Sequence, residues 1–143
     1  MSDADLMKLY SQRILALAAD IPGAEPLPAP DVRAEARAPL CGSTIRVELA
    51  LSGGRITGYA QQVRACALGQ ASASVFGRAV IGCEAAQVAR LRDELEAMLK
   101  GGPVPTPPFE GYEALLPARD YPNRHASILL APSATLKALA GAA

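Results

Sequence analysis

The stretch from Ser43 to Ala65 reads STIRVELALSGGRITGYAQQVRA, and it predicts a β-hairpin. Its first half alternates apolar residues with polar or small ones, the apolar set being Ile45, Val47, Leu49 and Leu51. Such alternation is typical of a strand with one buried face. Ser52-Gly53-Gly54 supplies a tight turn, because glycine adopts the backbone angles that hairpin turns need. The chain then returns as a strand, in which Gly58 marks a bulge.

A further strand is predicted before this hairpin. Residues 31–38 read DVRAEARA, in which small apolar residues alternate with charged ones. This pattern indicates an edge strand, since charged side chains protect an exposed sheet edge from pairing with other chains. Residues 31–65 therefore predict a small three-stranded antiparallel sheet with one buried face.

Helical periodicity dominates the rest of the chain. Apolar residues recur at helical spacing from Asp3 to Asp20, and Ile21-Pro22-Gly23 ends that helix. The segments predicted as helical after the sheet are 66–82, 84–100 and about 124–140, with one short turn at 112–116. Pro132 either kinks the last helix or begins it. We expect an α+β fold in a single domain over residues 1–143: a three-stranded antiparallel sheet covered on one face by helices, with an N-terminal helix.

Composition argues against several classes of protein. The 143 residues include 14 basic and 14 acidic side chains, so the formal net charge is zero and no basic footprint for nucleic acid is expected. No apolar run approaches the roughly 20 residues that span a bilayer, and the acidic N-terminus does not resemble a signal peptide. The odd number of cysteines, 3, does not fit a disulfide framework. We therefore expect a reduced, cytoplasmic protein whose cysteines are free or bind metal.

Two of the cysteines are predicted to lie close together. Cys41 and Gly42 precede the second strand, and Cys66 follows the third strand where a helix begins. A hairpin returns the chain to the edge at which it started, so Cys41 and Cys66 should meet there. The alternative is that each cysteine is a small buried residue, and we interpret Cys83, at an N-cap-like position before the next helix, as incidental.

The single histidine, His125, lies in the segment NRHAS at residues 123–127. A lone histidine is more often a surface or core residue than a ligand. A Cys–His protease pair is not supported by a suitably spaced Asn or Asp. The sequence also lacks C-x-x-C, G-x-S-x-G, Walker and dinucleotide motifs. This segment alone therefore assigns no function to His125.

Two longer segments together resemble a known family. Residues 40–82, LCGSTIRVELALSGGRITGYAQQVRACALGQASASVFGRAVIG, combine a Cys-Gly that opens a strand, a hairpin, a second cysteine and an Ala-Ser-x-Ser helix. Residues 121–139, YPNRHASILLAPSATLKAL, are similar to the last helix of the NifU/IscU-type iron–sulfur cluster assembly scaffolds. The long segment 101–120 resembles the SufU-like branch, and the resemblance covers nearly the whole chain.

This resemblance implies a ligand set. By position, Cys41 and Cys66 match the first two cysteines of the family and His125 matches its histidine, which would make them ligands of an iron–sulfur cluster, expected to be [2Fe–2S], or of zinc. Ser43 stands where the family has an aspartate, and Ala126 stands where it has its third cysteine. With fewer thiols, two chains could share a cluster as a homodimer, an external thiol could complete it, or zinc could occupy a Cys2His site.

The resemblance also implies a function. The first expectation is a scaffold, not an enzyme, that binds iron and a transient cluster and passes it on. The second is a zinc-bearing protein that accepts sulfur from a cysteine desulfurase, and the third is a degenerate member that only binds other proteins. The implied partners are a cysteine desulfurase and recipient apo-proteins, with no nucleic acid and no membrane.

Overall fold

The structure, a computed structural model, describes residues 12–39 and 42–142. Three strands form one antiparallel sheet in the order β1-β2-β3. Their bounds are Val32–Arg37 for β1, Thr44–Ser52 for β2 and Arg55–Arg64 for β3. The predicted sheet is thus confirmed. β1 lies at an edge and exposes its charged side chains, as its alternation indicated.

The predicted hairpin joins β2 and β3. Ser52 pairs with Arg55, and between them Gly53 and Gly54 have φ angles of 59° and 79°. Both central residues therefore occupy the left-handed region that a tight two-residue turn requires.

The bulge lies one residue away from the predicted position. The strand register shifts after Ala50, which pairs with Gly58, while Leu51 pairs with Ile56. The extra residue is consequently Thr57. Gly58 is needed for a different reason: a Cβ there would lie 3.1 Å from the Cβ of Ala50.

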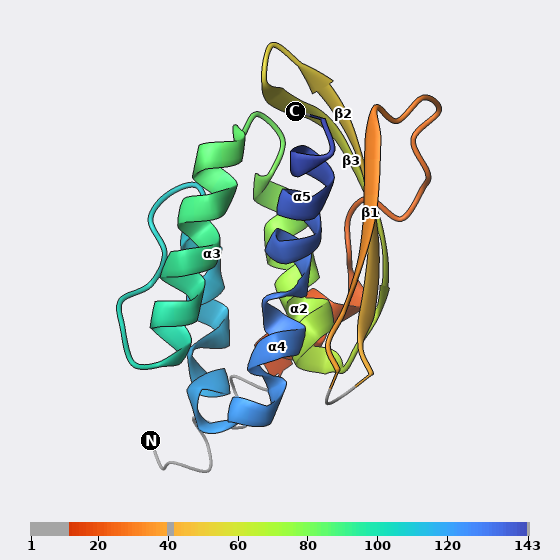
Figure 1. The fold of residues 1–143 in the computed structure, drawn as a ribbon. Helices are drawn as coiled ribbons and strands as arrows, with labels where there is room; N and C mark the ends of the chain where they lie inside the picture. Colours follow the sequence, from red (N-terminus) through yellow and green to blue (C-terminus); the bar gives the residue numbers. More distant parts are fainter. Residues whose placement is uncertain (1–11, 40–41, 143) are drawn as a thin grey trace.

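The helices gather on one face of the sheet (Figure 1). Residues 12–19 are helical, whereas the earlier part of the predicted N-terminal helix lies outside the described residues. The later elements are α2 (Ala67–Ala79), α3 (Ala85–Leu99), the 3-10 helices η1 (Glu110–Asp120) and η2 (Pro122–Arg124), α4 (His125–Ile128) and α5 (Leu130–Ala140). α2, α4 and α5 lie next to the sheet and α3 lies beyond them, so the α+β prediction is confirmed with the helices in two layers. None of the helices within 12–39 and 42–142 combines the length and apolar composition needed to cross a membrane.

α2 is the central helix of the core. The sequence predicts one apolar stripe on it, but residues 71–76 are all buried, including Ser72 and Ser74. The ring of Phe76 meets that of Tyr59 edge-on at 5.6 Å and stacks on that of Phe109 at 5.6 Å. α2 is covered on several sides, so its small residues serve close packing and not a single interface.

The boundaries of the later helices differ from the predictions. α3 begins after Glu84, which is its N-cap and shares a capping box with Gln87, so Cys83 is not the cap. The expected short turn near 112–116 is the longer η1. The last helix is interrupted at Leu129, and Pro132 lies within the first turn of α5, where its missing N–H removes no helical hydrogen bond.

The buried side chain of Gln61 ties β3 to its neighbours. Its Nε2 atom donates to the carbonyl oxygens of Pro22 and Ala73, at 2.9 and 3.0 Å. Its Oε1 atom accepts a hydrogen bond from the Tyr59 hydroxyl at 3.0 Å. One amide therefore satisfies three polar groups from the N-terminal segment, α2 and β3.

Replacing Gln61 by Leu should lower the free energy of unfolding by about 2–4 kcal/mol, because three buried polar groups lose a partner. The matched control is Gln62→Leu, since Gln62 is the next residue and is exposed; it should change stability by less than about 0.5 kcal/mol. Denaturant unfolding of both variants measures the difference. Equal stability of the two would contradict the role of Gln61.

Candidate functional site

Cys66 lies at the start of α2, as the sequence predicts. It is the N-cap residue, with an extended backbone, and its side chain makes no capping hydrogen bond to the first turn. The thiol is partly exposed, and its Sγ atom lies 3.7 Å from the Oγ atom of Ser127 in α4. The thiol therefore faces the short helix α4.

Ser127 links Cys66 to the start of the sheet. Its Oγ atom donates a hydrogen bond of 3.1 Å to the Oγ atom of Ser43, just before β2. Ser127 and Ser43 are buried, whereas Ala126 is exposed. The structure thus sets Ser127, and not Ala126, against Cys66. Sequence reasoning missed this residue; the available signal was its place in NRHAS, one position after Ala126.

A glycine in the first turn of α2 allows α4 to approach. A Cβ atom on Gly69 would collide with the Oγ atom of Ser127 and would lie 2.8 Å from the Cβ atom of Ala65. The space that Gly69 leaves is therefore filled by the serine that contacts Cys66.

Hydroxyl groups also hold α2 against α4 one turn further along α2. Ser72 donates through Oγ to the carbonyl oxygen of Ile128 at 2.5 Å. The Tyr112 hydroxyl donates to the carbonyl oxygen of Ser72 at 3.1 Å. Burial raises the pKa of Tyr112 far above its ordinary value, so the hydroxyl remains neutral. η1, α2 and α4 are thereby held in one arrangement.

His125 is the first residue of α4 and is partly exposed. Its Nε2 atom lies 2.8 Å from the carbonyl oxygen of Ala118 in η1. A carbonyl oxygen only accepts, so Nε2 is the donor in this bond, and in the neutral imidazole the lone pair is then on Nδ1. Metal-binding histidines commonly donate their second ring N–H to a carbonyl in this way. His125 can therefore offer Nδ1 to a metal.

Cys41 lies outside the described residues, but the ends of its loop are defined. Ala38 donates from its amide to the carbonyl oxygen of Ser43, and Gly42 donates to that of Ala38. β2 then begins at Thr44, which pairs with Arg64, two residues before Cys66. The proximity of Cys41 to Cys66 stays a prediction, and this register is consistent with it.

Within the described ranges, no group of three or more His, Cys, Asp or Glu side chains is placed to hold a metal ion. The donors that the structure brings together are the thiol of Cys66 and the hydroxyls of Ser127 and Ser43. A site with two thiolates consequently requires Cys41. A thiolate at Cys66 would suit iron or zinc better than magnesium or calcium, which prefer carboxylate and carbonyl oxygens.

Cys83 belongs to the core. Its side chain is 2% exposed, and its thiol donates to the carbonyl oxygen of Ala79 at 3.5 Å. Burial raises the pKa of Cys83, although Arg55 and Arg90 oppose the shift, so the thiol stays protonated. This agrees with its interpretation as incidental and makes it a control for variants of the other cysteines.

Solved structures reveal close relatives of this fold. A nitrogen-fixing NifU-like protein (N-terminal) from Brucella abortus is 42% identical, with 92% of each chain covered and a TM-score of 0.87. A hypothetical protein is 23% identical over 93% of this chain and 98% of its own, with a TM-score of 0.82. A candidate iron–sulfur cluster assembly scaffold protein for the SUF system, from Fervidobacterium islandicum AW-1, is 20% identical over 92% and 97%, also with a TM-score of 0.82.

The last two likenesses are of the fold, because their sequence identity is low. No family model matches the sequence, and no curated protein matches it. The Brucella protein is similar enough to this chain, in sequence identity and in coverage, to show that the two are homologous. The chain belongs to the family of NifU-like N-terminal domains, which confirms the resemblance to NifU/IscU/SufU-type proteins.

Gly69→Ala should lower the free energy of unfolding by about 1–3 kcal/mol, because its Cβ atom overlaps Ser127 and Ala65. Gly141→Ala is the control, since the nearest atom to its Cβ would lie at an ordinary 3.4 Å. Adding Ser127→Ala to Gly69→Ala removes one of the two overlaps and should restore part of the loss. Thermal unfolding measures all three, and Gly69→Ala matching the control would contradict the close approach of α4.

Proposed function

We propose that this chain is an iron–sulfur cluster assembly scaffold, which binds iron and a transient cluster and passes the cluster to a recipient apo-protein. Its membership of the NifU-like family supports a scaffold role. The fold is also shared with a protein named as a candidate scaffold for the SUF system. The observation that carries the proposal is the partly exposed Cys66 thiol at the start of α2, facing Ser127 of α4, which in turn bonds to Ser43 just before β2.

In this proposal Cys41 and Cys66 bind the iron as thiolates, and Nδ1 of His125 is the third ligand. Iron in clusters prefers thiolate ligands, and a cluster usually takes four of them. Two chains could therefore share a [2Fe–2S] cluster through Cys41 and Cys66 of each. The cluster is cargo, and the chain itself catalyses no reaction.

Ser127 has a supporting role at the bound thiolate. Its hydroxyl donates to Ser43 in this structure, with Sγ of Cys66 at 3.7 Å on its other side. Once Cys66 loses its proton, its sulfur only accepts hydrogen bonds. The same hydroxyl can then turn and donate to that sulfur, which would tune how firmly the metal is held.

The proposed partners follow from the scaffold role. A cysteine desulfurase would supply sulfur, and apo-proteins would receive the finished cluster, in the cytoplasm. A protein with the same fold is named as a candidate scaffold for the SUF system, which supports a role for this chain in such an assembly system.

A zinc-bearing sulfur acceptor for a cysteine desulfurase is the second candidate. The hydrogen bond from Nε2 of His125 to Ala118 favours it, because this arrangement is common among zinc-binding histidines. Two thiolates, one imidazole and one small ligand would complete a tetrahedral site.

Anaerobic reconstitution with iron and sulfide tests the scaffold proposal. The wild-type protein should gain iron, acid-labile sulfide and visible charge-transfer bands, and Cys41→Ala and Cys66→Ala should each lose them. Cys83→Ala should keep them, since Cys83 lies in the core. A Cys66→Ala variant that binds as much iron and sulfide as wild type would refute the proposal. Stoichiometric zinc after purification without added metal, lost in His125→Ala, would favour the second candidate.

Ser127→Cys and Ala126→Cys form a matched pair. A thiol at 127 would face Cys66, whereas one at 126 would lie on the exposed side of α4. Under reducing conditions Ser127→Cys should slow removal of the reconstituted cluster by a chelator by roughly tenfold. Ala126→Cys should leave that rate unchanged. A gain in Ala126→Cys alone would favour residue 126, and not residue 127, as the position that corresponds to the family's third cysteine.

A further inference from the structure

The outer face of the sheet, away from the helices, carries a concentration of arginines at the end nearest Cys66. Thr44 of β2 lies between Arg37 of β1 and Arg64 of β3 in the strand register. Neighbouring strands are about 4.8 Å apart, so the Cα atoms of the two arginines stand roughly 10 Å apart across a small residue. Arg46 follows two residues along β2 on the same face. All three arginines are exposed.

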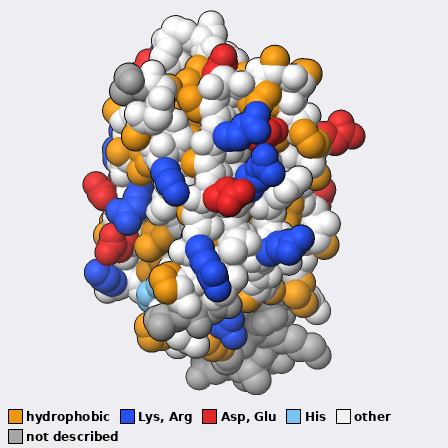
Figure 2. Space-filling model, turned by 45° about the vertical axis from the view of Figure 1, so that its right-hand side comes forward, with side chains coloured by type: hydrophobic (Ala, Val, Ile, Leu, Met, Phe, Trp, Pro, Cys, Tyr) orange, Lys and Arg blue, Asp and Glu red, His pale blue; other side chains and the backbone are white. Residues whose placement is uncertain are grey.

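These side chains surround an open hollow of about 540 Å³. Its charged lining residues are Arg37, Arg46, Arg64, Lys137 and Glu35. The Lys137 ammonium donates to the carbonyl oxygen of Glu35 at 3.0 Å, at the edge of β1. Figure 2 turns this side of the molecule forward and shows blue basic side chains spread over it, with red acidic ones among and beside them. The hollow is therefore strongly positive, although the whole chain has no net charge.

The three arginines form no ion pair within the described part of the chain, although Glu35 lies opposite Arg46 in the strand register. The ion pairs found there are Arg55–Glu84, Arg78–Asp20 and Lys100–Glu96. Within the described residues, no ion pair or side-chain hydrogen bond involves Arg37, Arg46 or Arg64. The arginines that do make side-chain hydrogen bonds lie elsewhere in the chain. Their guanidinium groups are thus available to carboxylates from outside.

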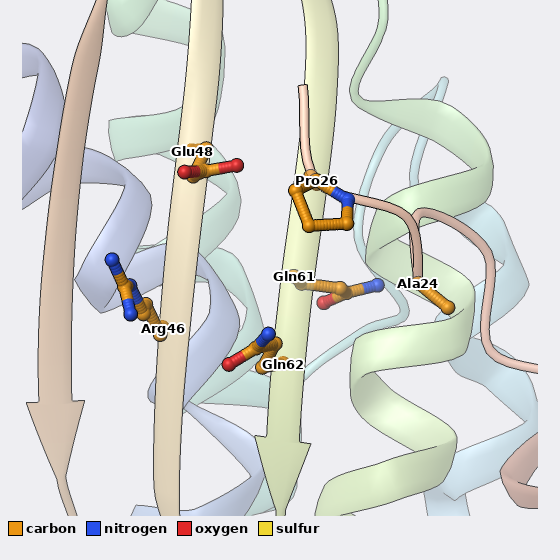
Figure 3. A pocket seen from close by; sticks show the side chains of 7 residues that line it. Ala24, Pro26, Arg46, Glu48, Gln61 and Gln62 are labelled. Atoms are coloured by element: carbon orange, nitrogen blue, oxygen red, sulfur yellow. The ribbon is translucent and has the colours of Figure 1, made fainter. Parts of the chain in front are cut away.

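Part of the outer face is covered by the chain itself, whereas Arg33, Arg55 and Thr57 are exposed. The segment after the N-terminal helix crosses it: the amide of Leu27 donates to Glu48, and the carbonyl of Gly23 accepts from the amide of Gln61. Figure 3 shows Ala24 and Pro26 of this segment beside the strands, where they line one pocket together with Arg46, Glu48 and Gln62. The half of the face that adjoins the Cys66 end stays open.

We propose that this open half is the docking surface for an acidic surface of a partner protein. Arginine suits carboxylates because its planar fork can donate two parallel hydrogen bonds. Single exposed ion pairs are worth little, so a partner must engage several arginines at once, which favours a protein surface over a free small anion. Glu35 and Glu48 interrupt the positive charge, and the outward positions of β1 to β3 hold no aromatic residue, which disfavours nucleic acid.

The position of this surface connects it with the proposed scaffold function, on which its biological role rests. Arg64 precedes Cys66 by two residues, and Thr44 follows the loop that contains Cys41. A partner seated here would lie alongside the metal-binding end without occupying it. Docking itself needs no bound metal.

Nuclear magnetic resonance titration of the apo-protein, residues 1–143, tests the proposal. A Glu-rich peptide should shift the amide signals around residues 37, 44, 46 and 64, and Arg46→Gln/Arg64→Gln should weaken its binding by roughly tenfold. Arg46→Glu/Arg64→Glu should abolish it. The control Arg13→Gln/Arg90→Gln removes two exposed arginines elsewhere and should bind as wild type does.

Two results would overturn the proposal: an equal loss in the control variant, or binding of inorganic phosphate or a single-stranded oligonucleotide at these residues as strongly as the peptide. The Gln variants should also take up iron and sulfide like wild type, and a loss of iron in them would contradict a surface separate from the ligands. Because the titration uses apo-protein, failed reconstitution of the wild type would count against the scaffold function alone.

Discussion

The close approach of α4 to the first turns of α2 is the constraint on which the candidate site depends. Gly69 leaves the space that Ser127 fills, and Ser72 holds the backbone of α4 through the carbonyl of Ile128. A larger residue at either position of α2 would push α4 outward. Ser127 would then lose its contact with Cys66. The run of small residues in α2 is thus a requirement of the site as much as of the core.

The hairpin provides the other half of the arrangement. Its Gly53-Gly54 turn fixes the register in which Thr44 pairs with Arg64, so the chain before β2 and the chain after β3 emerge together. Ser43 meets Ser127 there, and α2 begins at Cys66. The same register aligns outward-facing arginines beside the thiol. One hairpin therefore positions both Cys66 and the candidate docking surface.

The sequence predicted those features that local patterns determine. Alternation and the Gly-Gly turn predicted the sheet, and helical spacing predicted α2 and α3. The bulge at Thr57, the break at Leu129 and the contact of Ser127 with Cys66 depend on how distant elements pack. The expectation that His125 lies beside the two cysteines came from a family resemblance and stays a prediction. The same resemblance pointed to Ala126, one residue before the Ser127 that contacts Cys66. Only the fold reveals which of the two faces inward.

The most direct test of the account is a crystal structure of the anaerobically reconstituted protein, with anomalous scattering recorded at the iron and zinc absorption edges. The account predicts iron peaks bonded to the Sγ atoms of Cys66 and Cys41, at about the 2.3 Å typical of first-row metal–thiolate bonds, with Ser127 adjacent. Iron bound elsewhere, or a metal-free Cys66 in protein that contains stoichiometric iron and sulfide, would contradict it.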